Sequence, residues 1–174
     1  MSESLSLYRE LDELIICFHN KNILPYTNVP HLHSQYEFYY NIDGASGMFI
    51  DKKLYECTGH DLFLIPRLSV HKVMIPREAD YERCIINIDA KVVDAINATP
   101  GLHSPLLWMT GVGQSTPKKV NLNDAEHQIF VDMISEYNKA KDELSRYSIF
   151  LKILAFLSGF FAIGKKCEGA LKET

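Results

Sequence analysis

The sequence lacks the features that would place it in several common protein classes. Its four cysteines form no CxxC pair, which excludes a zinc ribbon and a thioredoxin-type redox motif. The first residues show neither the basic nor the apolar region of a secretory signal, so we expect a reduced, cytoplasmic protein. Basic residues are not in excess, because 18 Lys and Arg against 22 Asp and Glu give a net charge of −4. A domain that grips the DNA backbone would normally be basic.

Long hydrophobic runs are also scarce. The one candidate, residues 147–164, is interrupted by a single charge, Lys152. A membrane-spanning helix needs about 20 mainly apolar residues, and a central lysine costs roughly 2.5–3.5 kcal/mol on insertion. The run therefore predicts a buried helix, and we expect no membrane association.

The first half of the chain has the pattern of a β protein. The chain has 174 residues, 47% of them hydrophobic, enough for one domain with an appendage. Between residues 12 and 89, short β-branched and aromatic runs alternate with turn signals such as Asp43-Gly44. This spacing predicts an antiparallel sandwich or small barrel. Residues 98–123 are rich in Gly, Pro, Ser and Thr and predict an irregular connector, anchored to the core by residues 106–109.

After Asn123 the hydrophobic period becomes helical. Asn123 and Glu126 stand at the two positions of a capping box, and a second helix is predicted from about Leu144 to Ile163. The apolar residues of the second helix cover well over half of its circumference, so it has to be covered from two sides. A second protomer is the natural cover for the outer side. We therefore predict a homodimer through these helices, with four contact residues: Tyr147, Leu151, Leu154 and Phe161.

The polar residues that could bind a metal or a ligand are concentrated in one group of the sequence. His31, His33 and Glu37 are separated by even numbers of residues in a run that predicts a single strand. Their side chains are therefore expected on the same face of that strand. His71 begins a later strand. Three imidazoles and a carboxylate inside a barrel are a candidate site for a divalent transition metal such as Zn, Ni, Fe or Mn. Without a metal, the same residues and Tyr39, which shares their parity, would line a pocket for a small molecule.

These residues carry a resemblance to a known family. HLHSQYEFYYNIDG resembles the first cupin motif and GHDLFLIPRLSVH the second. Leu68 stands where the second motif usually has glycine, and Ile75 where it usually has asparagine. The resemblance implies a mainly β fold, a double-stranded β-helix (jelly-roll) barrel with its site inside, followed here by the α-helical hairpin.

A wider resemblance covers nearly the whole chain. The order of barrel, loop and helices is similar to the N-terminal effector-binding and dimerisation half of AraC-type transcriptional regulators. It implies a cupin-like sensor with its connector over residues 1–122, a dimerisation hairpin over 123–164 and a tail over 165–174. The family's helix-turn-helix half, absent from this chain, would make the DNA contacts. The implied partner is a small-molecule effector, a sugar or a small organic acid, and many such sensors bind it without a metal.

Three functions remain open on the sequence: a non-catalytic sensor, a metal-dependent cupin enzyme of the dioxygenase or isomerase type, and a dimerisation scaffold. The apolar hairpin favours the sensor, because a catalytic barrel needs no such appendage. No dedicated acid–base pair accompanies the candidate ligands. The sequence therefore predicts a protein that is not an enzyme.

Overall fold

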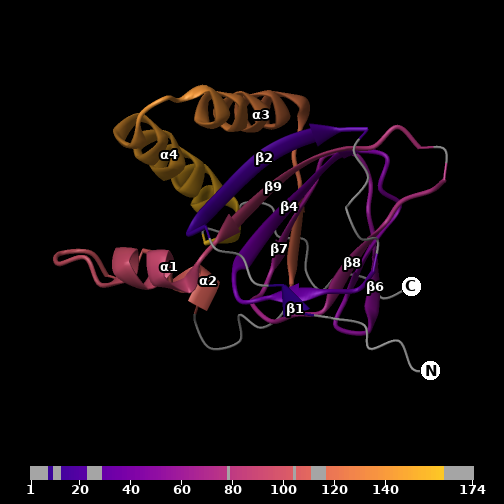
Figure 1. Ribbon diagram of the computed structural model, residues 1–174, viewed down its shortest axis with the longest axis horizontal. Helices are drawn as coiled ribbons and strands as arrows, with labels where there is room; N and C mark the ends of the chain where they lie inside the picture. Colours follow the sequence, from indigo (N-terminus) through magenta and orange to yellow (C-terminus); the bar gives the residue numbers. More distant parts are fainter. Residues whose placement is uncertain are drawn as a thin grey trace.

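Two facing β-sheets and a helical hairpin make up the computed structural model, which describes residues 8–9, 13–22, 29–77, 79–103, 105–110 and 117–162 (Figure 1). The larger sheet has five strands in the order β10-β7-β4-β9-β2, and the smaller has three in the order β6-β5-β8. A short parallel pair joins β1 to β3. The strands are β1 Tyr8–Arg9, β2 Ile15–Lys21, β3 Leu32–His33, β4 Tyr36–Asp43, β5 Gly47–Ile50, β6 Lys53–Glu56, β7 Asp61–Ile65, β8 His71–Met74, β9 Glu82–Ile88 and β10 Lys118–Asn121. The helices are α1 Ala90–Asn97, α2 Leu107–Thr110, α3 Asp124–Lys139 and α4 Glu143–Phe161. The predicted mainly β, cupin-like fold with a C-terminal helical hairpin is confirmed.

The five-stranded sheet is buried on both faces. On β4, Phe38 and Tyr40 belong to the apolar cluster beneath the helices, whereas Tyr39 belongs to the cluster between the two sheets. Because side chains alternate along a strand, Glu37 points with Tyr39 into the space between the sheets. Met48 and Ile50 of β5 face them from the smaller sheet. One strand thus lines the interior with one set of residues and supports the helices with the other.

The helical hairpin packs on the outer face of the five-stranded sheet. The predicted capping box is present, with Asn123 accepting from the Glu126 amide and Glu126 accepting from the Asn123 amide. Asp142 caps α4 by accepting from the Ser145 amide. Phe161, at the end of α4, stacks on Trp108 at 5.9 Å between ring centroids. The predicted anchoring of the connector is therefore confirmed, since Leu106, Trp108 and Met109 are buried there.

Two local predictions were wrong. The run from His31 to Tyr40 is not one strand, because it breaks at Ser34-Gln35 between β3 and β4; the buried Gln35 amide donates to the Glu13 carbonyl. The connector is not wholly irregular, since residues 118–121 form β10 along the edge of β7. With a single buried residue, Val120, β10 has too little apolar pattern to be recognised alone. The predicted tail, residues 165–174, lies outside the described residues.

One described helix, α4, is long and apolar enough to cross a membrane by length and composition. Core helices of soluble proteins meet the same criterion. Its inner side packs on the five-stranded sheet through six buried residues: Phe150, Ile153, Leu154, Leu157, Phe160 and Phe161. The helix is therefore accounted for as the cover of this sheet.

Candidate functional site between the two sheets

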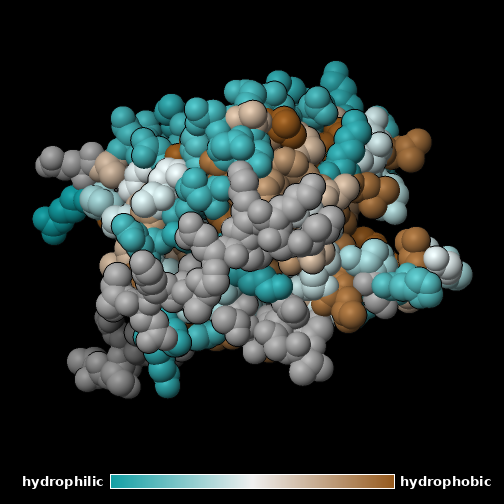
Figure 2. Space-filling model, turned by 180° about the vertical axis from the view of Figure 1, so that it is seen from behind, coloured by the Kyte–Doolittle hydropathy of each residue, from teal (hydrophilic) through white to brown (hydrophobic). Residues whose placement is uncertain are grey.

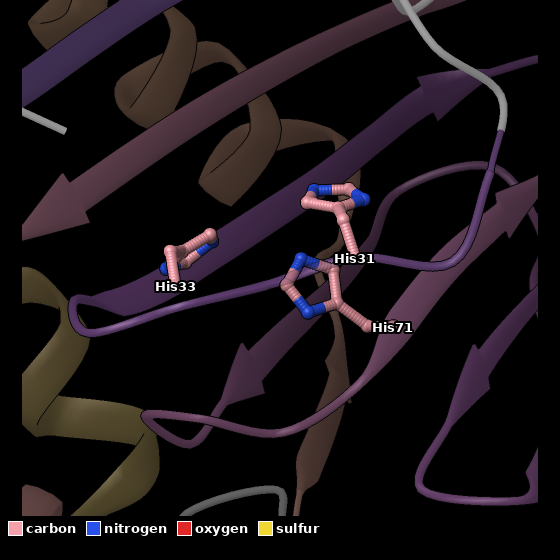
Figure 3. A group of neighbouring side chains, drawn as sticks. All are labelled: His31, His33 and His71. Atoms are coloured by element: carbon pink, nitrogen blue, oxygen red, sulfur yellow. The ribbon is translucent and has the colours of Figure 1, made fainter. Parts of the chain in front are cut away.

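Three histidines from two distant parts of the chain meet between the sheets. The His31 amide donates to the His71 carbonyl at 3.0 Å, and the His71 amide donates back at 2.8 Å. This bridge brings the two rings to 4.4 Å between centroids, and the ring of His33 lies 5.1 Å from that of His71. One nitrogen from each ring lies within 4.8 Å of the others, and Figure 3 shows the three rings gathered together.

The backbone fixes which nitrogen of each ring can act. In all three histidines, Nδ1 lies within hydrogen-bonding distance of a main-chain carbonyl two residues away: Val29 for His31 at 3.2 Å, Gln35 for His33 at 3.2 Å and Ser69 for His71 at 2.9 Å. A carbonyl only accepts, so each Nδ1 donates its proton. Nε2 of each ring is then the nitrogen that can bind a metal or a ligand, an arrangement that metal-binding histidines commonly share.

Glu37 lies against two of the three rings. Its Oε2 is 2.8 Å from Nε2 of His33 and 3.4 Å from Nε2 of His71. Burial alone would raise the pKa of Glu37, but the charge of His71 and the hydrogen bond from His33 outweigh it and hold this pKa well below its usual range. Burial alone would lower the pKa of His71, but the Glu37 carboxylate outweighs it and raises that pKa. The carboxylate is therefore ionised, and it stabilises the protonated form of His71.

The residues present fit a transition metal. Among the described residues, the buried Nε2 of His71 has no hydrogen-bond partner, although the Glu37 carboxylate is near. His31, His33 and His71 offer three imidazole nitrogens and Glu37 offers an oxygen, a donor set typical of Zn, Ni, Fe or Mn sites. The three nitrogens lie within 4.8 Å of one another, whereas a tetrahedral metal that holds each nitrogen at about 2.0–2.1 Å keeps them roughly 3.3 Å apart. The rings would therefore have to close by up to about 1.5 Å around the metal.

The turn that carries His71 contains the most conspicuous departure from the cupin motif. Leu68, which replaces the motif's usual glycine, has a φ of +60°, in the left-handed region that favours glycine. Its amide donates to the His33 carbonyl at 2.9 Å. The turn therefore keeps the conformation that a glycine would adopt, and it ties the two histidine-bearing segments together despite the substitution.

The interior continues beyond the histidines with the predicted Tyr39 and with three residues that were not among the predicted site residues, namely Tyr81, Arg83 and Asn87. The hydroxyls of Tyr39 and Tyr81 lie 3.0 Å apart; burial raises the pKa of Tyr81 to about 12 and that of Tyr39 well above its usual range. Arg83 and Asn87 of β9 are both buried. The sequence did contain a sign of Arg83 and Asn87, since they are two polar residues an even number of positions apart in the apolar run ERCIINI. Only the pairing with β4 shows that this parity faces the interior.

A family model, the AraC-like ligand binding domain, matches residues 15–154. The chain belongs to this family. Among solved structures, it is similar to wild-type ToxT from Vibrio cholerae with a bound unsaturated fatty acid (TM-score 0.54, 15% identity, 86% of this chain and 53% of that one). It is also similar to apo ToxT K231A from Vibrio cholerae (TM-score 0.58, 16% identity, 95% and 61%). A third match is ToxT from Vibrio cholerae bound to (E)-4-(8-methylnaphthalen-1-yl)but-3-enoic acid (TM-score 0.54, 9% identity, 87% and 56%).

Identities this low establish a shared fold. The AraC-like domain spans 53–61% of the length of these three ToxT chains. A search of curated proteins gave no match. The predicted membership of the AraC-type sensors is confirmed by the family model.

All five residues predicted to line the site lie in the interior. Glu37, Tyr39, His33 and His71 are buried, and His31 is half-buried. The structure gathers the three histidines and places Glu37 against His33 and His71, whereas the Tyr39 hydroxyl faces Tyr81. Contact of these residues with a ligand stays a prediction.

The four residues predicted for dimerisation divide into two groups. Tyr147 and Leu151 are 53% and 40% exposed on the outer side of α4. Leu154 and Phe161 are each only 4% exposed and lie in the core beneath the helices, so their inclusion in an outer face needs correction. The hydrophobic pattern of α4 did not distinguish the side that meets the sheet from the side that faces outward.

Proposed function

We propose that this AraC-like domain senses a small organic effector between its two sheets and relays the binding event through the helical hairpin to a DNA-binding half outside this chain. The observation that carries the proposal is the double role of β4. Its interior face presents Glu37 to the histidines and Tyr39 to the cluster between the sheets, and its other face presents Phe38 and Tyr40 to the helices. The relatives support a ligand of the organic-acid type, since two ToxT structures hold a fatty acid and an arylbutenoic acid.

The contact between β4 and α3 provides a route for the relay. The Tyr40 hydroxyl and Nδ1 of His127 form a hydrogen bond of 2.8 Å, and the Tyr40 ring meets that of Phe130 edge-on at 5.1 Å between centroids. A ligand that shifts β4 would therefore change how α3 packs on the sheet. The ligand redistributes two arrangements of the hairpin only to the extent that it binds one of them more tightly.

Binding can be followed through the single tryptophan. Trp108 contacts both Phe38 and Phe161, at 6.0 and 5.9 Å between ring centroids, so its fluorescence reports on the junction of sheet and hairpin. We would titrate panels of aliphatic carboxylic acids and of monosaccharides and record fluorescence and melting temperature. Saturable one-to-one binding that Tyr39→Ala weakens and the exposed His103→Ala leaves unchanged is the expected result. If neither panel nor a broader metabolite library binds, the sensor proposal fails.

We further propose that the functional unit is a homodimer through the outer face of the hairpin. Four apolar side chains are exposed on α3 and α4, namely Ile129, Leu144, Tyr147 and Leu151. Figure 2 shows exposed hydrophobic residues along the right-hand side, where the helices project. A second copy would cover them. A non-catalytic role in the cytoplasm is in keeping with a regulatory domain family.

A metal site is the second candidate function for the histidine cluster, favoured by the three Nδ1–carbonyl hydrogen bonds. We propose that His31, His33 and His71, with Glu37, hold one divalent transition metal. A bound metal would supply a Lewis-acidic contact for an oxygen of the effector. Elemental analysis of the purified protein should find close to one metal per chain, lost in His33→Ala and retained in His103→Ala. A metal content unchanged in His33→Ala would contradict the site.

A further inference from the structure

A cavity of about 240 Å³ lies where the helical hairpin meets the edge of the larger sheet. Residues 15–18 of β2 form one wall of this cavity. The rest of its lining is Glu13, which precedes that strand, and three hairpin residues, Tyr137, Asn138 and Arg146. Figure 1 shows α3 beside β2, which it contacts. No residue of the histidine cluster belongs to this lining, so the cavity is separate from the site between the sheets.

The wall formed by β2 is the open edge of a sheet. β2 is the last strand in its sheet, and within the described part of the chain it pairs with β9 alone. Side chains of successive strand residues point to opposite faces. A cavity that is lined by residues 15–18 without a gap therefore runs along the strand backbone and not along one face of the sheet.

The main-chain groups that face this cavity can be identified. The Leu14 carbonyl accepts from the Asp89 amide at 2.8 Å, on the side of β9. Because hydrogen-bonding groups of successive residues point to opposite edges of a strand, the N–H and C=O groups of Ile15 and Cys17 point to the outer edge. They offer two residues of the kind of pairing by which an extended peptide adds to a sheet.

One charged residue of each sign stands at the rim of the cavity. Glu13 and Arg146 are both exposed, and among the described residues neither of them forms a salt bridge. The Nε of Arg146 donates to the Ala140 carbonyl at 3.1 Å, which orients the guanidinium and leaves its terminal nitrogens as donors. A carboxylate is the group that best matches such a donor fork, and an ammonium group would suit Glu13.

These polar groups surround a common space. Burial raises the pKa of Tyr137, and smaller electrostatic effects on this pKa come from the other walls, namely from Cys17, Arg146 and Glu13. Such effects weaken with distance, so the groups that cause them lie near the phenol. The phenol stays protonated and can donate a hydrogen bond to a ligand.

The size of the cavity limits what it can hold. Its volume corresponds to about eight water molecules at the density of the liquid, less than the roughly 300 Å³ at which pockets for drug-sized ligands begin. A free dipeptide is of this size. It combines an extended amide group for the strand edge with a carboxylate at one end and an ammonium group at the other.

We propose that this cavity is a second ligand site, which binds a zwitterionic dipeptide with its main chain paired to Ile15 and Cys17 and its carboxylate on Arg146. The cavity is lined by β2 and by both helices of the hairpin, so a bound dipeptide would hold the turn between α3 and α4 against the sheet. The site is thereby a second input to the hairpin, and it does not depend on an effector between the sheets.

The test compares glycyl-leucine with two analogues that each lack one feature. Glycyl-leucine amide lacks the carboxylate, and glycyl-N-methylleucine lacks the amide N–H. Each is titrated into the ¹⁵N-labelled whole chain and followed by NMR, because a ligand of about a dozen non-hydrogen atoms is expected to bind with a Kd on the order of 1 mM. Glycyl-leucine should shift the amide signals of Ile15 and Cys17, and each analogue should bind about 2- to 10-fold more weakly.

Two exposed residues provide a matched pair of variants. Arg146→Gln should weaken the binding of glycyl-leucine about 2- to 5-fold, the range of an exposed ion pair, and leave the binding of its amide unchanged. Lys141→Gln, in the turn between the helices, removes the same charge outside the cavity and should bind both ligands as the wild type does. Circular dichroism checks that both variants are folded.

Three outcomes would overturn the proposal. One is equal affinity of the wild type for glycyl-leucine and its amide. Another is a set of shifted signals that excludes residues 15–18, because the peptide would then bind elsewhere. The third is the absence of any shift with glycyl-glycine, glycyl-leucine and glycyl-phenylalanine up to about 10 mM, roughly ten times the expected Kd. An organic acid or sugar that binds between the sheets in the same preparation would show that the sensor function survives such a failure.

Discussion

The exposed apolar face of the hairpin makes a quantitative prediction about assembly. Ile129, Leu144, Tyr147 and Leu151 are 52%, 77%, 53% and 40% exposed. Full burial of one large apolar side chain stabilises by roughly 1.5–3 kcal/mol. The four exposed fractions amount to about two whole side chains, so a second copy would gain roughly 6–13 kcal/mol from both protomers together. Association costs an estimated 4–15 kcal/mol, so the two terms are of the same size.

A dimer at micromolar concentration therefore needs a gain near the upper end of its range, and the loss of one side chain from so small a margin should dissociate it. Burying the exposed part of Leu151 in both protomers is worth roughly 1–2.5 kcal/mol. Its loss in Leu151→Glu weakens the dimer roughly 5- to 70-fold, before the repulsion between two buried carboxylates is counted. We expect Leu151→Glu to be monomeric at micromolar concentrations at which the wild type is dimeric.

Sedimentation velocity over a hundredfold range of concentration measures this directly. Lys152→Glu, on the neighbouring exposed position of α4, controls for the added negative charge and should stay dimeric. Leu154→Ala separates the inner side of the helix from the outer: because Leu154 is buried, the substitution should cost about 2–5 kcal/mol of folding stability, while the folded fraction remains a dimer. An unchanged dimer in Leu151→Glu would refute the assignment of this face.

Three further results are expected. Leu68→Gly should preserve or raise the melting temperature, although it removes a side chain, because a φ of +60° costs a non-glycine residue roughly 1–2 kcal/mol; a clear loss of stability would show that Leu68 packs on something essential. Burial and the neighbouring His60 lower the pKa of His127 in the folded protein. The contribution of His127 to folding stability is therefore fully present above its unfolded pKa near 6.5, and it is lost as the pH falls through the lower folded pKa. Urea titrations from pH 7.5 to 5 should therefore show a stability slope that His127→Gln reduces, and an identical slope would count against it. Burial raises the pKa of Cys17 and Cys57 to about 12, so peptide mapping should find both unmodified after native alkylation at pH 8 and labelled after unfolding.

The histidine cluster shows which contacts of a site the spacing of residues can predict and which it cannot. Equal parity correctly placed His33 and Glu37 together, although the chain breaks at Ser34-Gln35. The meeting of His31 with His71 depends on two hydrogen bonds between segments 40 residues apart, and spacing along the chain contains no information about that pairing. Here the resemblance to the cupin motifs supplied what the pattern did not.

Arg83 was not among the predicted site residues and Leu154 was placed on the wrong side of its helix, for a related reason. A period of 2 or 3.6 shows which residues share a face, but it does not show which face meets a neighbour. The pairing of β9 with β4 turns Arg83 inward, and the packing of α4 on the sheet turns Leu154 inward. Both facts belong to the tertiary structure. Elements with a strong local signal, such as the capping box at Asn123, needed no such information.

The central position of β4 explains why a ligand between the sheets should be felt by the helices. β4 is paired on both sides, with β7 and β9, so it moves as part of the sheet and not by itself. Since alternate residues of β4 face the site and the hairpin, a rotation that adjusts Tyr39 to a ligand carries Tyr40 in the opposite direction against α3. Close-packed interiors respond to such shifts by changing between discrete arrangements and not by gradual deformation. A substitution at Tyr40 should therefore leave the affinity for the effector nearly unchanged while it weakens the response of the hairpin, because Tyr40 contacts the helix and not the site.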